Sequence, residues 1–122
     1  MKYVLENLDV YNLSMEIAED IWTHVTSWKF LALDTVGKQI IRSSDSIAAN
    51  IAEGYGRYFY KENKQFCFYA RGSIMETKTW LTKSKNRKLI SSEQHKDLIG
   101  KLEIIHKKLN AYIKFIGKNQ GK

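Results

Sequence analysis

The feature that most constrains this chain is the complete absence of proline from its 122 residues. Proline breaks helices because it lacks a backbone N–H and clashes with the preceding turn. No apolar run approaches the roughly 18 residues of a membrane-spanning helix, and the first nine residues lack the apolar segment of a signal peptide. We therefore expect a mostly helical, cytoplasmic protein with no membrane partner, folded as a single domain over residues 1–122.

Apolar residues recur at three- and four-residue spacing in four segments, which predicts four helices. The pattern is strongest between Leu98 and Ile116, where spacings of four and three residues alternate. The predicted ranges are 8–28, 34–53, 61–85 and 92–116. Because the lengths are similar and the connections short, the sequence predicts an all-α, antiparallel up-down-up-down four-helix bundle.

Local signals mark several of the helix ends. Asp34 is expected to cap the second helix, and Ser91 begins a capping box at the start of the fourth. Gly54 and Gly56 are expected to end the second helix through a left-handed turn. Gly72 lies inside the third helix, where we expect it to allow close packing against the alanines of the second.

No arrangement of residues indicates a catalytic or metal site. Di-iron bundles use two Glu-x-x-His pairs, and only Glu103 and His106 form one, since His24 and His95 lack the upstream Glu. Cys67 is the single cysteine, which excludes an internal disulfide, suits a reducing compartment, and is best explained as a small buried hydrophobe. We therefore expect no enzyme activity, no metal and no cofactor.

Two stretches are unusual for a simple bundle: residues 39–57 and Ala70–Glu76. In the first, polar residues follow one another at spacings of four, four and three along an otherwise apolar helix: Arg42, Ser46, Asn50 and Glu53. Buried polar groups require hydrogen-bond partners. We therefore expect this polar row to meet Ser73 and Glu76 of the third helix, or a loop.

These two stretches carry a resemblance to a known family. Ser46–Arg57 matches the pattern S-I-x-x-N-I-A-E-G-x-G-R, and Ala70–Glu76 matches A-R-G-S-x-x-E. The chain thus resembles the bacterial four-helix bundle proteins, a family named after a ribosomal-type protein encoded in intervening sequences of rRNA genes. A related branch contains the accessory variability protein of diversity-generating retroelements, a basic pentamer that binds nucleic acid.

The resemblance implies a small up-down bundle that assembles into a ring-like homo-oligomer, a homopentamer. It also implies a mainly structural role for the motif residues, with Asn50 and Glu53 holding the corner between the second and third helices. The alternative is that Arg42 and Arg57 face a ligand or a neighbouring subunit. The motif residues are Arg42, Ser46, Asn50, Glu53, Gly54, Gly56, Arg57, Gly72, Ser73 and Glu76.

Positive charge is concentrated in the second half of the chain, since residues 1–60 carry a net −3 and residues 61–122 a net +10. Four cations recur every seventh residue of the third helix and form what we name the cationic stripe: Lys64, Arg71, Lys78 and Lys85. Lys101 and Lys108 add cations on the fourth helix. If the two helices are neighbours, these six residues form one basic wall that suits phosphate contact with RNA or DNA.

Two other interpretations of this wall stay open. One is an ordinary solvated face. The other is electrostatic pairing with an acidic first helix of an adjacent subunit, through Glu16, Glu19 and Asp20. We favour nucleic acid over either.

An aromatic corner, Tyr55, Tyr58, Phe59 and Tyr60, lies beside Arg57 and Lys61. Such residues can stack on bases, but we favour packing on the bundle end or on a partner subunit. The sequence therefore predicts a non-catalytic homo-oligomer that contacts RNA or DNA non-specifically. The alternative is a scaffold that binds a protein partner and has no nucleic-acid role.

Overall fold

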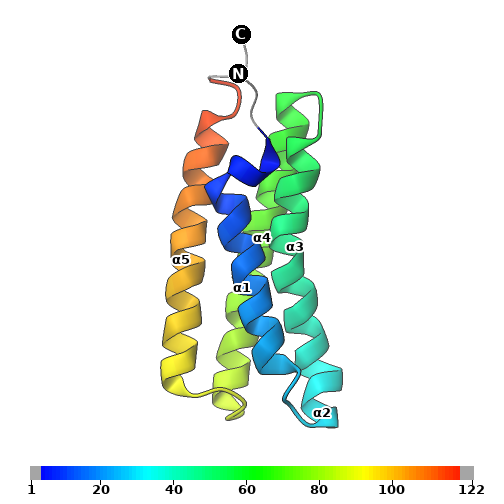
Figure 1. Cartoon of the computed structure of the whole chain (residues 1–122), viewed down its shortest axis with the longest axis vertical. Coiled ribbons are helices and arrows are strands. Elements are labelled where there is room, and N and C mark those ends of the chain that lie inside the picture. Colours follow the sequence, from blue (N-terminus) through cyan, green and yellow to red (C-terminus); the bar gives the residue numbers. More distant parts are fainter. Residues whose placement is uncertain (1–3, 119–122) are drawn as a thin grey trace.

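The protein is described by a computed structural model, in which residues 4–118 are placed. Four long helices lie side by side (Figure 1), and no strand occurs among the described residues. The elements in chain order are η1 (Leu5–Asn7), α1 (Asp9–Val25), α2 (Phe30–Ala32), η2 (Leu33–Gly37), α3 (Lys38–Tyr55), α4 (Tyr60–Asn86) and α5 (Ser92–Phe115). The prediction of an all-α helical bundle is confirmed.

Each long helix packs against two others: α3 against α1 and α4, and α5 against α4 and α1. The turn between α3 and α4 lies at the upper end of Figure 1, and the connections after α1 and after α4 lie at the lower end. Branched aliphatic side chains fill the space between the helices. Ile17 of α1, Ile47 of α3, Ile74 of α4 and Leu102 of α5 are all buried. Burial of such side chains contributes about 1.5–3 kcal/mol each and holds the four helices together.

The second long helix begins earlier than the sequence indicated. Helical structure runs without a break from Phe30 through a π-helical turn, η2, into α3. Asp34 therefore lies inside this run, and its carboxylate pairs with Lys38 of the next turn at 2.9 Å. The prediction that Asp34 caps the helix is wrong, because no residue between Lys29 and Asp34 interrupts helical hydrogen bonding.

The glycines do not act as the sequence indicated. Gly56 ends α3 with a φ of −81°, so the prediction of a left-handed turn at Gly54 and Gly56 is wrong. Gly54 permits close approach instead, since a Cβ there would lie 2.8 Å from the backbone oxygen of Asn63 on α4. Gly72 is exposed with no other group within 4 Å of the position a Cβ would take, so the prediction that it packs against α3 is also wrong.

The capping box at the start of α5 is confirmed. The Gln94 backbone N–H donates to the Ser91 hydroxyl at 3.0 Å, and the Ser91 N–H donates to Gln94 Oε1 at 2.8 Å. Both bonds satisfy backbone N–H groups at the helix start and fix where α5 begins.

Candidate functional site

The cationic stripe lies along the seam between α4 and α5. Lys64, Arg71, Lys78 and Lys85 each follow a buried residue of α4 by one position, and all four are half-buried. At seven-residue spacing successive members are separated by about 10.5 Å, so the stripe extends about 31 Å along the helix. The α4 backbone thus sets the spacing of four positive charges along one side of the helix.

Arg71 is held by two neighbours. Its Nη1 donates to Asn110 Oδ1 of α5 at 2.8 Å, and its guanidinium lies 5.1 Å from the centre of the Phe68 ring. Both partners are uncharged. They orient the guanidinium without neutralising it.

The two lysines towards the lower end of the stripe face histidines of α5. The pKa of His106 is lowered by desolvation and by the charges of Lys78 and Arg71. The pKa of His95 is lowered by desolvation and by Lys85. Burial is the larger cause of each pKa shift, and the neighbouring cations of the stripe add to it.

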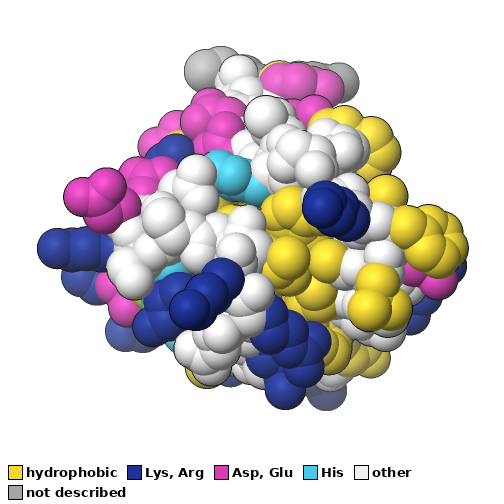
Figure 2. Space-filling view, turned by 90° about the horizontal axis from the view of Figure 1, so that it is seen from below, with side chains coloured by type: hydrophobic (Ala, Val, Ile, Leu, Met, Phe, Trp, Pro, Cys, Tyr) yellow, Lys and Arg dark blue, Asp and Glu magenta, His cyan; other side chains and the backbone are white. Residues whose placement is uncertain are grey.

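No carboxylate of residues 4–118 lies within ion-pair distance of any member of the cationic stripe. At its upper end, Lys64 Nζ lies near Gly117, about 4.0 Å from where a Cβ on that residue would be. Figure 2 looks onto the lower end of the bundle. Most Lys and Arg side chains lie in the lower half of that view, and most Asp and Glu side chains lie in the upper half. The stripe therefore retains its positive charge.

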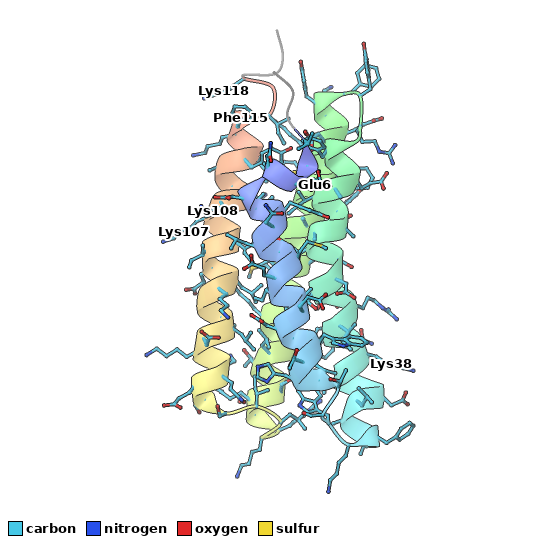
Figure 3. The ribbon with its side chains drawn as sticks, in the orientation of Figure 1. Glu6, Lys38, Lys107, Lys108, Phe115 and Lys118 are labelled. Carbon is cyan, nitrogen blue, oxygen red and sulfur yellow. The ribbon has the colours of Figure 1, made fainter. Side chains whose placement is uncertain are left out.

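Lys101 and Lys108 lie on the opposite side of α5, against α1. Lys101 Nζ is 2.9 Å from the Asp20 carboxylate and 3.3 Å from that of Asp97, and Lys108 Nζ is 3.4 Å from that of Asp9. The hydrogen bond to Asp20 is the main cause of the raised pKa of Lys101. Figure 3 shows Lys107 and Lys108 projecting from α5 on the outside of the bundle.

The prediction of one basic wall is therefore wrong, although α4 and α5 are neighbours. Lys101 and Lys108 precede core residues of α5 by one position, whereas Asn110 and His106 follow core residues by one. On a helix, the residue before a core position and the residue after it lie on opposite sides of the buried face. Of the four, only His106 and Asn110 face α4. In the sequence, His106 was weighed only as a metal ligand, and Asn110 was not identified. The position of both residues directly after core residues of α5 was the signal that could have placed them beside the stripe.

The motif residues do not form the contacts that were expected between α3 and α4. Ser46 donates to the Arg42 carbonyl at 2.8 Å, Asn50 donates to the Ser46 carbonyl at 2.9 Å, and Glu53 pairs with Arg57 at 2.8 Å, so all of these contacts stay local. The prediction that the row meets Ser73 and Glu76 is wrong, because the polar groups of the row bond to residues four positions away in the chain, and Arg42 and Glu53 are exposed.

The polar contact between α3 and α4 is made by residues that the sequence did not single out. The hydroxyl oxygens of Ser43 and Thr77 lie 2.9 Å apart in the core. Thr77 also lies 2.7 Å from the Ser73 carbonyl, while Glu76 accepts from the Trp80 indole N–H at 3.1 Å. Arg42 directly precedes the buried Ser43 in the chain and is itself exposed.

The family model described as "23S rRNA-intervening sequence protein" matches residues 6–111. The chain belongs to this family. The resemblance inferred from the two motifs is thereby confirmed. The fold is also similar to the crystal structure of a protein of unknown function from the S23 ribosomal protein family of Bacteroides thetaiotaomicron. That chain is 26% identical, with a TM-score of 0.77 over 86% of this chain and 98% of the other. No curated protein matches.

Neither the family description nor the similar crystal structure indicates an enzyme activity. The residues that could take part in catalysis or metal binding do not lie together. Glu103 is exposed and His106 half-buried, and no group of three His, Cys, Asp or Glu in residues 4–118 is arranged to hold a metal ion. Cys67 is buried, which raises the pKa of its thiol to about 12. None of the helices in the described part of the chain has the length and apolarity needed to cross a membrane.

The aromatic corner is expected to pack on the bundle end or on a partner subunit, and the structure bears on the first of these. Tyr58 is 87% exposed and Phe59 61% exposed, and Tyr60 is exposed as well, while Tyr55 is half-buried. Packing on the protomer's own end is therefore wrong for Tyr58 and Phe59. Both residues lie in the short connection between α3, which ends at Tyr55, and α4, which begins at Tyr60.

Proposed function

We propose that this member of the 23S rRNA-intervening sequence protein family is a non-catalytic, homo-oligomeric bundle that contacts RNA or DNA. The observation that carries the proposal is the cationic stripe, in which Arg71, Lys78 and Lys85 face an amide or histidine groups of α5. Binding would come from phosphate contact and the release of counterions, without reading of base sequence. We place this activity in the cytoplasm.

The regularity of the stripe supports phosphate contact. Charges about 10.5 Å apart on one side of a helix present several contacts to a polyanion that follows the seam. Arg71 offers a planar fork with an orientation set by Asn110, while the lysines act as flexible point charges. With four contacts, log K should fall with log salt at a slope of about −3.

We further propose that this up-down-up-down bundle is the protomer of a ring-like homo-oligomer, a pentamer as the family resemblance implies. Exposed Met15 and Trp22 on α1, with Phe30 and Leu31 at the lower end, support a contact between protein chains. Asp20 is engaged by Lys101 of its own chain, which counts against a ring held by stripe-to-acidic-helix pairing. Light scattering coupled to size exclusion tests this part, and a clean monomer contradicts it.

Two double variants with equal loss of charge test the nucleic-acid part. Lys78→Gln with Lys85→Gln removes half of the stripe, and Lys101→Gln with Lys108→Gln removes the same charge from the carboxylate-paired side of α5. Fluorescence anisotropy with mixed RNA and DNA oligonucleotides across a salt series measures affinity and slope. We expect the first variant to lose about 1.5 from the salt slope and the second to change it little.

Two results would overturn the proposal. Absence of binding at low salt, or binding indifferent to salt, rules out phosphate contact. An equal loss in both variants shows that net charge rather than the stripe is responsible. A stable oligomer that binds no nucleic acid would instead favour the alternative function, a scaffold for a protein partner, which the exposed Phe30 and Leu31 support.

A further inference from the structure

Tyr58 and Phe59, two residues of the aromatic corner, are exposed and lie outside the hydrophobic core. Tyr58 and Phe59 form an edge-to-face pair with ring centres 4.8 Å apart and planes at 89°. They lie in the short connection between α3 and α4, at the upper end of Figure 1. Large exposed aromatic surfaces commonly mark sites of interaction.

The corner borders a hollow of about 330 Å³, lined by Tyr55, Arg57, Tyr58, Phe59, Tyr60 and Asn63. This volume lies at the lower end of the range for small-molecule sites. Asn63 is only 6% exposed, and its Nδ2 donates to the Tyr112 hydroxyl of α5 at 3.4 Å. The hollow thus has aromatic walls and a polar group fixed beneath them by the core.

The corner is continuous with the cationic stripe. Because α4 begins at Tyr60, Lys64 lies one turn further along the same helix, and the rest of the stripe follows from there. Arg57 is fixed on the other side of the corner by Glu53 at 2.8 Å and by the Phe66 ring at 4.8 Å. Basic side chains beside stacking aromatics are the combination by which proteins bind single strands.

We propose that the aromatic corner stacks on unpaired bases of a single-stranded nucleic acid whose phosphates follow the cationic stripe. This inference rests on the proposed function and adds a preference for single strands to it. The charge beside the corner favours bases over a second copy of the chain. Lys61 and Lys64 follow its rings on α4, and their positive charge attracts phosphates and would repel the same surface of another copy. Apolar side chains away from the stripe, such as Trp22, are better suited to contact between chains.

An oligonucleotide with abasic spacers separates stacking from phosphate contact, because it keeps every phosphate and lacks the bases. We expect the unmodified protein to bind a pyrimidine single strand at least tenfold more tightly than an abasic strand of the same length. Tyr58→Ala with Phe59→Ala should abolish that preference and leave affinity for the abasic strand unchanged. The control is Ile104→Ala, which removes an exposed apolar side chain of α5 away from the corner and should keep the preference.

The outcomes separate this inference from the proposed function. Equal, salt-dependent binding of both strands overturns stacking and leaves phosphate contact intact, whereas no binding of either strand overturns both. A smaller mass of the Tyr58→Ala, Phe59→Ala variant in light scattering would identify the corner as a contact between copies and would also overturn stacking. Circular dichroism verifies the fold, and the conservative exchange Tyr58→Phe should retain the preference because it keeps the ring.

Discussion

Gly54→Ala tests the close approach of α3 and α4. In an unconstrained helix this change stabilises by about 1 kcal/mol, because alanine loses less conformational entropy than glycine on folding. At Gly54, however, the new methyl group would lie 2.7 Å from Asn63 Oδ1, 2.8 Å from its backbone oxygen and 3.0 Å from Phe66 Cβ. The backbone oxygen cannot turn away as a side chain can, so the two helices must separate.

The cost of that separation follows from the same geometry. Overpacking of this kind costs about 1–3 kcal/mol, and a shift of Asn63 would also weaken its hydrogen bond to Tyr112, worth about 1 kcal/mol. Subtracting the gain in helix propensity leaves a net destabilisation of about 1–3 kcal/mol. The steric clash with α4 therefore outweighs the higher helix propensity of alanine.

Gly72→Ala is the matched control, because Gly72 also lies inside a helix but has no group within 4 Å of the position that a Cβ would take. We expect it to raise the free energy of unfolding by about 1 kcal/mol. Urea denaturation followed by circular dichroism, at one fixed protomer concentration, measures both variants. If Gly54→Ala proved as stable as the unmodified protein, or if both variants shifted in the same direction, the inferred packing would be refuted.

Three further predictions concern ionisable groups. Cys67, whose thiol pKa is raised to about 12 by burial, should stay unmodified by an aromatic disulfide reagent at pH 8 and should react only in denaturant. Because His106 has a lowered pKa in the folded protein, the unfolded chain binds its proton more readily, so the free energy of unfolding should fall as pH drops below about 6.5. His106→Gln should reduce that fall in urea titrations at pH 7.5 and 5.5. Lys78→Gln with Lys85→Gln relieves like-charge repulsion and should match or slightly exceed the unmodified protein in stability at low salt, while a loss above about 1 kcal/mol would contradict this reasoning.

Features determined within a few residues could be predicted from the sequence. The helices follow from apolar spacing, and the capping box depends only on Ser91 and the three residues after it. Asp34 shows the limit of such signals. Its carboxylate suits a cap, but a cap also requires the helix to stop before it, and the preceding residues continue the helix instead. The same carboxylate therefore pairs with Lys38 of the next turn.

Features that depend on which helices are neighbours on which side could not be predicted. Spacing shows that Lys101 and His106 flank the α5 core on opposite sides, but the hand of the bundle decides which side meets α4. In this bundle Lys101 meets α1 and His106 meets α4. The role of Gly54 has the same origin, since a glycine in a sequence does not reveal which backbone lies opposite.

The contrast between the two sides of α5 supports the proposal that the cationic stripe binds an anion. On the α1 side, Lys101 and Lys108 meet carboxylates, and exposed pairs of this kind contribute at most about 1 kcal/mol each. On the α4 side, Arg71 and Lys78 meet no carboxylate of the described residues, and their charges make protonation of the neighbouring histidine less favourable. The free energy that holds them in place comes from the core beneath, where Ile74 is fully buried. These charges are thus positioned by a fold to which they contribute little, and an anion bound along the seam would remove the repulsion among them.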